Sequence, residues 1–266
     1  MSYKNFAVIY NNLIENSATV KDEIIKILED RGVSATGINI DNLKNGFDFV
    51  IVVGGDGTIL KASRFYAKFS TPVFGINLGR LGFLSQSSAE NLECSLIKIL
   101  NGKFKTENRI MLKCDGKHAL NDIVIKGSMS GRTSKFSLKI NDKTVCDYLA
   151  DGLIISTPTG STAYGLSAGG PVLYPALGAF VVVPICPHTL SARPLVVPDT
   201  EKISIIAGEE NSTYFLSADG QEFSKWFTKI DIEKSEYEAK LVLLDDVDFY
   251  SVLKNKFGWG TSPANL

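Results

Sequence analysis

The first hundred residues alternate short apolar runs with stretches whose apolar residues recur at helical spacing. Residues 5–10 (NFAVIY) and 47–53 (FDFVIVV) are apolar runs, and the second is apolar on both faces, as a buried parallel strand is. Between these runs, Val20, Ile24 and Leu28 are spaced four positions apart, which places them on one face of a helix. The pattern predicts an α/β domain with an open, mostly parallel sheet.

The same rhythm continues to about residue 102. It predicts a helix from about Thr58 to Lys68, a strand in residues 72–78 (PVFGINL) and a helix in residues 89–100 (AENLECSLIKIL). From about Phe104 the pattern changes to short alternating strands joined by turns, which indicates a β-rich second part.

The change of rhythm divides the chain of 266 residues into two domains, which agrees with about 150 residues per domain. We expect an α/β domain over residues 1–102 and a β-rich domain over residues 103–245. For the last segment, residues 246–266, the hypothesis is a helix that packs back on the first domain.

Charge and cysteine usage exclude several kinds of partner. The 28 basic and 29 acidic residues give a net charge of -1, so no overall field favours nucleic acid or an anionic membrane. No apolar stretch reaches the roughly 18 to 20 residues of a membrane helix, and the N-terminal apolar run is too short for a signal peptide, so a cytoplasmic protein is expected. The four cysteines and two histidines form no cluster, and no metal site made by protein ligands alone is expected.

The glycine-rich stretch GGDGT, residues 54–58, lies between a predicted strand and a predicted helix. Backbone N–H groups and the positive end of the helix can bind an anion there, but neither a Walker loop nor G-x-G-x-x-G fits the spacing. In one interpretation Asp56 accepts the proton of a hydroxyl that is being phosphorylated, and in the other it only caps the helix. The first interpretation assigns the donor phosphates to Gly54, Gly55, Gly57 and Thr58.

A second polar stretch, residues 151–171 (DGLIISTPTGSTAYGLSAGGP), contains six hydroxyl residues, several glycines and Tyr164. Glycines let a ligand approach the backbone, hydroxyl groups offer hydrogen bonds, and Tyr164 can stack on a ring. Ordinary polar loops rarely keep such density over twenty residues, so the composition favours a binding site.

Six motifs follow one another along the chain: GGDGT at 54–58, GINLGRLGFL at 75–84, LND at 120–122, residues 151–171, PHTLSARPL at 187–195 and DGQ at 219–221. Together these motifs resemble the NAD kinase family, whose members phosphorylate NAD to NADP with ATP or polyphosphate. They run in order from about residue 6 to residue 222, and the pair TPTGSTAY and PHTLSARP is the most specific part. The resemblance implies that family's fold, an α/β N-terminal domain followed by a β-rich C-terminal domain.

The resemblance also implies a role for each matching residue. Asp56 would be the general base on the 2′-hydroxyl of the adenosine ribose, with Gly57 beside it. Asn121 and Asp122, where the family usually has Asn-Glu, would contact the ribose and base, and Asp151 would bind the nicotinamide part. The other substrate-binding residues that it implies are Arg132, Thr162, Ala163, Tyr164, Ser167 and Gln221.

The donor and the assembly follow from the same resemblance. Mg²⁺ on the donor phosphates is expected, because the glycine turn fixes no lysine or arginine that would neutralise them. NAD and ATP or polyphosphate are the expected partners, and the family implies a homodimer or homotetramer. Three alternatives stay open at this point: a lipid or sugar kinase that shares only GGDGT, a non-catalytic NAD(P)-binding regulator and, more remotely, a hydrolase that uses His188.

Overall fold

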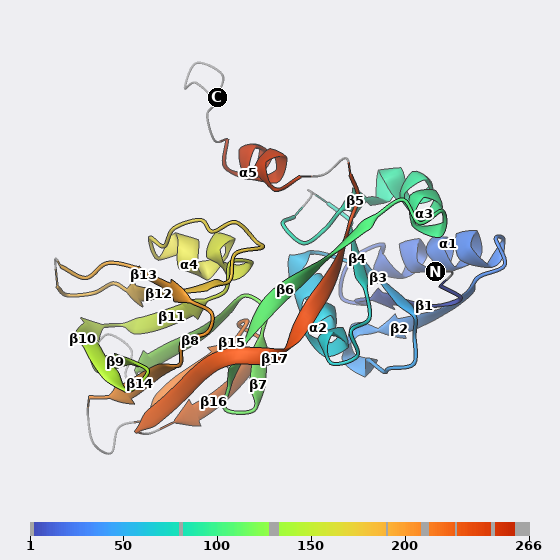
Figure 1. The fold of residues 1–266 in the computed structure, drawn as a ribbon. Coiled ribbons are helices and arrows are strands. Elements are labelled where there is room, and N and C mark those ends of the chain that lie inside the picture. The colour runs from blue at the N-terminus through green and yellow to red at the C-terminus, as the bar shows by residue number, and fades with distance from the viewer. Residues whose placement is uncertain are drawn as a thin grey trace. The chain divides into compact units, whose positions relative to one another are not determined.

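The computed structural model describes residues 3–79, 82–127, 133–189, 191–208, 213–226, 228–245 and 248–258. The chain forms two compact units: Met1–Asn108 together with Ala239–Leu266, and Arg109–Glu238. Each unit has its own buried apolar core, and the elements of both are drawn in Figure 1. Among the residues of these ranges, no helix is both long and apolar enough to cross a membrane.

The first unit is built on a parallel sheet in the order β2, β1, β3, β4. Beyond β4, the end of a long strand, β17 (Lys229–Leu243), pairs in parallel through Leu241 and Val73. A two-residue strand, β5 (Ser87–Ser88), pairs with the end of β4. The four parallel strands are β1 (Asn5–Tyr10), β2 (Ser34–Asn39), β3 (Phe49–Val53) and β4 (Val73–Asn77).

Helices cover both faces of this sheet. On one face, α1 (Ser17–Glu29) and α3 (Leu92–Leu100) pack into one core with alternate residues of β3 and β4. The helix α2 (Asp56–Ala67) lies on the other face. Successive residues of a strand point to opposite faces, so Gly75 of β4 faces away from Phe74 and Ile76, and a β-carbon at Gly75 would meet the side chain of Ile59 on α2. Figure 1 shows the sheet between these helices, which is the open α/β architecture that the sequence predicts.

The second unit contains an antiparallel sheet in the order β13, β12, β11, β8, β15, β16. Its residues Ile123, Leu153 and Phe180 share a core with Phe136 and Leu138 from a second group of strands. The six strands are β8 (Asp122–Gly127), β11 (Gly152–Ser156), β12 (Ala179–Ile185), β13 (Leu195–Pro198), β15 (Tyr214–Ala218) and β16 (Glu222–Trp226).

The second group of strands pairs in the order β10, β9, β14 and the first part of β17. Asn141 and Asp142 form the turn between β9 and β10, and both have positive φ. The β-rich character of this half is confirmed. The strands are β9 (Ser134–Ile140), β10 (Lys143–Ala150) and β14 (Ile203–Ala207), with β6 (Lys105–Cys114) and β7 (Lys117–Ala119) as a further antiparallel pair.

The last described element is the helix α5 (Phe249–Phe257). Asp248 caps its N-terminus by accepting hydrogen bonds from the N–H groups of Tyr250 and Ser251, and Gly258 ends it in the left-handed region. The ring of Phe257 lies 5.6 Å from that of Phe83, centroid to centroid. The helix therefore contacts the loop that follows β4.

Candidate functional site

The GGDGT turn joins the end of β3 to the start of α2. Gly54 has a φ of 155°, and a β-carbon there would lie 2.8 Å from Oγ1 of Thr58, so only glycine fits this position. Gly55 is the N-cap residue of α2 and, as a glycine, has no side chain that could accept a capping hydrogen bond. The turn therefore places a helix N-terminus at the carboxyl end of a parallel strand, where open α/β sheets bind anionic ligands.

Asp56 is the first residue of α2, and its carboxylate is held by the loop after β4. Its Oδ2 accepts a hydrogen bond from the N–H of Phe83 at 2.9 Å, and its Oδ1 accepts one from the N–H of Leu84 at 3.3 Å. A β-carbon at Gly82 would lie 1.9 Å from Oδ1, so the loop can approach the carboxylate only with glycine there. The interpretation of Asp56 as the helix cap is wrong, because Gly55 has that position and the carboxylate bonds to the loop instead.

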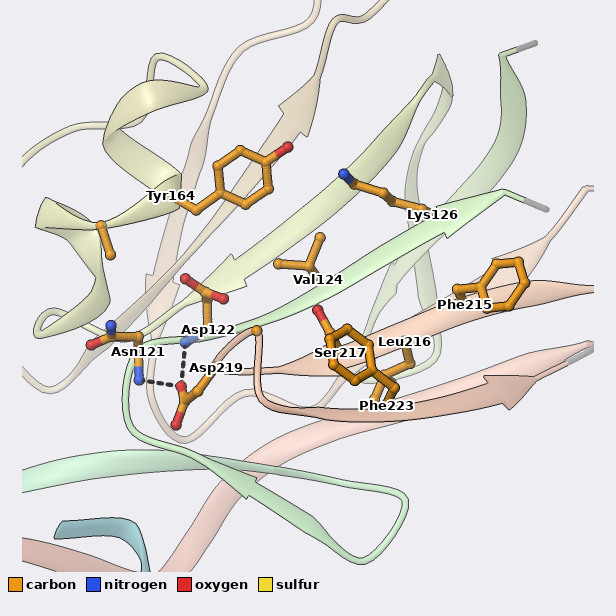
Figure 2. A pocket seen from close by; sticks show the side chains of 12 residues that line it. Asn121, Asp122, Val124, Lys126, Tyr164, Phe215, Leu216, Ser217, Asp219 and Phe223 are labelled. Carbon is orange, nitrogen blue, oxygen red and sulfur yellow. Dashed lines mark hydrogen bonds between the residues drawn. The ribbon is translucent and has the colours of Figure 1, made fainter. Parts of the chain in front are cut away.

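The second unit contains a cavity of about 380 Å³, shown in Figure 2. It lies over the outer side of β8 and of the hairpin β15–β16, beside the short helix α4 (Tyr164–Ser167). Four residues expected at the site line it: Asn121, Asp122, Ala163 and Tyr164. The other lining residues are Val124, Lys126, Phe215, Leu216, Ser217, Asp219, Gly220 and Phe223.

Aromatic rings and one ammonium group give this cavity its chemical character. Tyr164, Phe215 and Phe223 are all exposed, and Nζ of Lys126 lies 5.4 Å from the centroid of the Tyr164 ring. Figure 2 shows Tyr164 directed toward Lys126 above β8. Exposed aromatic faces next to a cation suit a ligand with a flat ring and a negatively charged group.

Phe215 and Phe223 are not among the candidate site residues identified from the sequence. They occupy outward positions of neighbouring strands, in a hairpin where Phe215 pairs with Lys225 and Phe223 with Ser217. The signal for the hairpin is present, since Asp-Gly is a typical turn sequence and both Asp219 and Gly220 have positive φ. Two phenylalanines on the solvent side of such a hairpin are the feature that could have indicated a binding surface.

Asp122 is the buried acid of this cavity, with 4% of its surface exposed. Burial raises the pKa of its carboxyl group to about 7, and the negative charge of Asp219 contributes in the same direction. The carboxyl group of Asp122 is thus protonated over much of the range below neutral pH and can donate a hydrogen bond there.

The raised pKa makes the free energy of unfolding depend on pH. The folded state holds the Asp122 proton more tightly than the unfolded state, whose pKa is near 3.8, so this contribution is full below pH 4 and falls as the pH rises to about 7. The loss is on the order of 4 kcal/mol, at about 1.4 kcal/mol per pKa unit. We expect Asp122→Asn to flatten the fall of stability between about pH 4 and pH 7, measured by urea unfolding. Parallel curves for both proteins would contradict this account.

Most hydroxyl groups of the stretch 151–171 form hydrogen bonds within the protein, to the backbone of this stretch, to the backbone of residues 120–121 or to Arg109. Thr157 Oγ1 donates to the carbonyl of Leu120 at 2.6 Å, and Ser161 Oγ donates to that of Pro158 at 2.6 Å. Thr159 Oγ1 accepts a hydrogen bond from Nη1 of Arg109. These hydroxyl groups therefore serve mainly as hydrogen-bond partners of buried polar groups, which fixes the conformation of the loop.

The remaining predicted residues are not among those that the structure places around the cavity. Asp151 is exposed between β10 and β11, and its N–H donates to Ile185. Thr162 Oγ1 donates to the carbonyl of Thr159, and Ser167 is the exposed last residue of α4. Gln221 follows the turn of the hairpin β15–β16. Arg132 lies outside the described residues.

Comparison with protein families finds two matches that lie in sequence along the chain. Residues 9–104 match the ATP-NAD kinase N-terminal domain, and residues 120–244 match the ATP-NAD kinase C-terminal domain. An NAD kinase of Clostridium botulinum (strain Loch Maree / Type A3) is 38% identical over 273 residues, covering 96% of this chain and 97% of the relative. One of Pseudomonas fluorescens (strain Pf0-1) is 40% identical over 254 residues, covering 91% and 85%.

Two solved structures agree with these matches. An NAD kinase from Archaeoglobus fulgidus in complex with ATP superposes with a TM-score of 0.78 at 32% identity, over 96% of this chain and 97% of its own. Yeast NADH kinase complexed with NADH superposes with a TM-score of 0.84 at 25% identity, over 98% and 89%. The two family matches, the near full-length relatives and the shared fold show that the chain belongs to the NAD kinase family, a family of phosphotransferases.

Proposed function

We propose that the chain transfers the terminal phosphoryl group of ATP to the 2′-hydroxyl of the adenosine ribose of NAD, giving NADP and ADP. The ribose oxygen forms a bond to the γ-phosphorus, the bond from that phosphorus to the β,γ-bridging oxygen breaks, and the hydroxyl proton goes to Asp56. The observation that carries the proposal is the carboxylate of Asp56, fixed at the GGDGT turn by two N–H groups of the loop after β4.

Asp56 works in this reaction mainly by its position. A carboxylate is a weak base in water, but a base held in place beside the reacting hydroxyl needs little basicity when the phosphoryl transition state is loose. Each oxygen of the carboxylate accepts one hydrogen bond and keeps a further lone pair, so both bonds to the loop can persist while the proton is accepted.

The donor phosphates are assigned to the same turn. The backbone of Gly54, Gly55 and Gly57 and the residue Thr58 lie at the N-terminus of α2, whose positive end favours an anion. Mg²⁺ is usually bound by one or two carboxylates together with substrate phosphates and water, and a single carboxylate at this turn fits that set of ligands. Asp56 is the residue that would hold the ion, which supplies charge neutralisation on the phosphate oxygens.

The cavity of the second unit is assigned to the adenosine part of NAD. Tyr164 offers an exposed ring for stacking, worth on the order of 1 kcal/mol, and Asn121 and Asp122 offer hydrogen-bonding groups to the ribose and base. Contacts by Arg132, Asp151, Thr162, Ala163, Ser167 and Gln221 belong to the proposal through family resemblance. A homodimer or homotetramer is proposed on the same ground.

The activity is tested with the purified full chain, Mg²⁺, NAD and separate phosphoryl donors: ATP, GTP and inorganic polyphosphate. We expect NADP with ATP, measured by a dehydrogenase that accepts only NADP. NAD whose adenosine lacks the 2′-hydroxyl is the matched control and should give no phosphorylated product. NADH in a parallel reaction reports whether the reduced substrate is accepted. Absence of NADP with every donor, from protein that melts cooperatively, would refute the proposal.

A further inference from the structure

The backbone of residues 120–122 is held by a carboxylate that the reaction itself does not use. Asp219 Oδ2 accepts a hydrogen bond from the N–H of Leu120 at 3.0 Å, and its Oδ1 accepts from the N–H groups of Asn121 at 2.7 Å and Asp122 at 3.2 Å. Figure 2 shows the bonds to Asn121 and Asp122. Asp219 therefore contacts three consecutive N–H groups from a hairpin almost a hundred residues away in the sequence.

The opposite edge of the same backbone is also bonded. The Oγ1 of Thr157 donates to the carbonyl of Leu120, and the N–H of Thr157 donates to the carbonyl of Asn121 at 2.9 Å. A β-carbon at Gly160 would lie 2.0 Å from that same carbonyl oxygen of Asn121. The peptide groups of residues 120–122 are thus fixed from two sides, while the side chains of Asn121 and Asp122 line the cavity.

We propose that Asp219 is a positioning residue for nucleotide binding. Its carboxylate fixes the backbone of residues 120–122 so that the side chains of Asn121 and Asp122 are held where the ribose and base of NAD bind. The inference rests on the proposed function, because it takes NAD as the ligand of the cavity.

The role requires a carboxylate and not only a side chain of this size. An ionised carboxylate has about four lone-pair positions and no donor, so it can accept three N–H bonds at once. An asparagine in the same place would turn its NH₂ group toward at least one of the three N–H groups. Asp219→Asn is therefore expected to shift the 120–122 backbone while the hairpin, whose turn asparagine adopts readily, stays formed.

The test compares Asp219→Asn with Asp48→Asn. Asp48 is a matched control, because its Oδ2 also accepts two consecutive N–H groups, those of Lys4 and Asn5, both at 3.1 Å, in the first unit. Calorimetry gives the Kd for NAD, kinetics give KM for NAD and ATP, and thermal melting gives Tm. We expect Asp219→Asn to raise Kd and KM for NAD at least tenfold with KM for ATP within twofold. Asp48→Asn can keep both bonds on its single amide oxygen, so this charge-matched control should leave Tm and the NAD affinity close to wild type.

A second variant reaches the same backbone without altering Asp219. Gly160→Ala places a β-carbon against the carbonyl of Asn121 and should give the same selective loss of NAD affinity. Gly165→Ala is its control, since a β-carbon there meets nothing closer than Ser156 Cβ at 3.7 Å. If Asp219→Asn does not fold, the NAD affinity of Gly160→Ala tests the inference instead.

Three outcomes would overturn the inference. The first is that Asp219→Asn folds and binds NAD with an affinity within twofold of wild type. If the wild type makes NADP in the same experiments, the proposed function remains intact and only the inference about Asp219 fails. The second is a parallel rise of KM for NAD and for ATP, which indicates general damage. The third is wild-type protein that binds no NAD, which would remove the proposed function as well.

Discussion

Asp56→Asn is expected to lower kcat by at least about 100-fold while the Kd for NAD stays within a few-fold of wild type. A general base typically contributes about 10²–10⁴-fold, and the neutral amide cannot take the proton of the ribose hydroxyl. The amide can also accept only one of the two loop bonds that the carboxylate accepts, so a stability loss of about 1–3 kcal/mol is expected alongside. Steady-state kinetics and calorimetry measure the two effects separately.

The control for this experiment is Asp41→Asn, which changes the charge of the unit by the same amount. Asp41 contacts Nζ of Lys61 on α2 at 2.7 Å and is exposed, so its loss should leave kcat unchanged. If Asp56→Asn retained kcat within a few-fold of wild type, Asp56 would not be the base. The same result would also exclude Asp56 as a necessary ligand of Mg²⁺, because a neutral amide binds this ion much more weakly than a carboxylate.

Gly82→Ala should cost at least about 100-fold in kcat although residue 82 bears no reactive group. The added β-carbon would lie 1.9 Å from Oδ1 of Asp56, so either the carboxylate or the loop must move by more than an ångström. A displacement of about 1 Å at a reacting group can cost about 10²-fold. Steady-state kinetics at saturating NAD and ATP measure the loss.

Gly79→Ala, in the segment before, is the matched control. A β-carbon at residue 79 meets only Asn77 Oδ1, at 3.8 Å, so kcat should remain close to wild type. Equal kcat values for the two alanine variants would mean that the fixed position of the Asp56 carboxylate does not matter to the reaction.

Much of the first unit could be predicted because its strands and helices have clear periodicity. The apolar runs of β1, β3 and β4 and the spacing along α1 each identify the element within a few residues. β2 was missed because its sequence, SATGIN, has few apolar residues and its pairing with β1 is decided by the sheet. Local pattern therefore predicts the elements whose burial is strong and misses those at the edge.

The parts of the candidate site that consist of residues adjacent in the sequence could be predicted. The turn that holds Asp56 and the polar stretch around Tyr164 are both local. The partners of Asp56 are 27 and 28 positions away, and Asp219 reaches N–H groups 97 to 99 positions away. Such bonds depend on the tertiary fold, so no spacing in the sequence indicates them.

The division of the chain has a consequence for its synthesis on the ribosome. The core of the first unit includes Val242 and Leu244, and the N–H of Leu244 donates to Oε1 of Gln86 at 3.1 Å. These residues are translated only after the whole stretch from Arg109 to Glu238. The nascent first unit therefore emerges with β4 lacking its neighbour β17, and an unpaired strand edge is prone to aggregation. Its folding can be completed only after nearly all of the chain has been made.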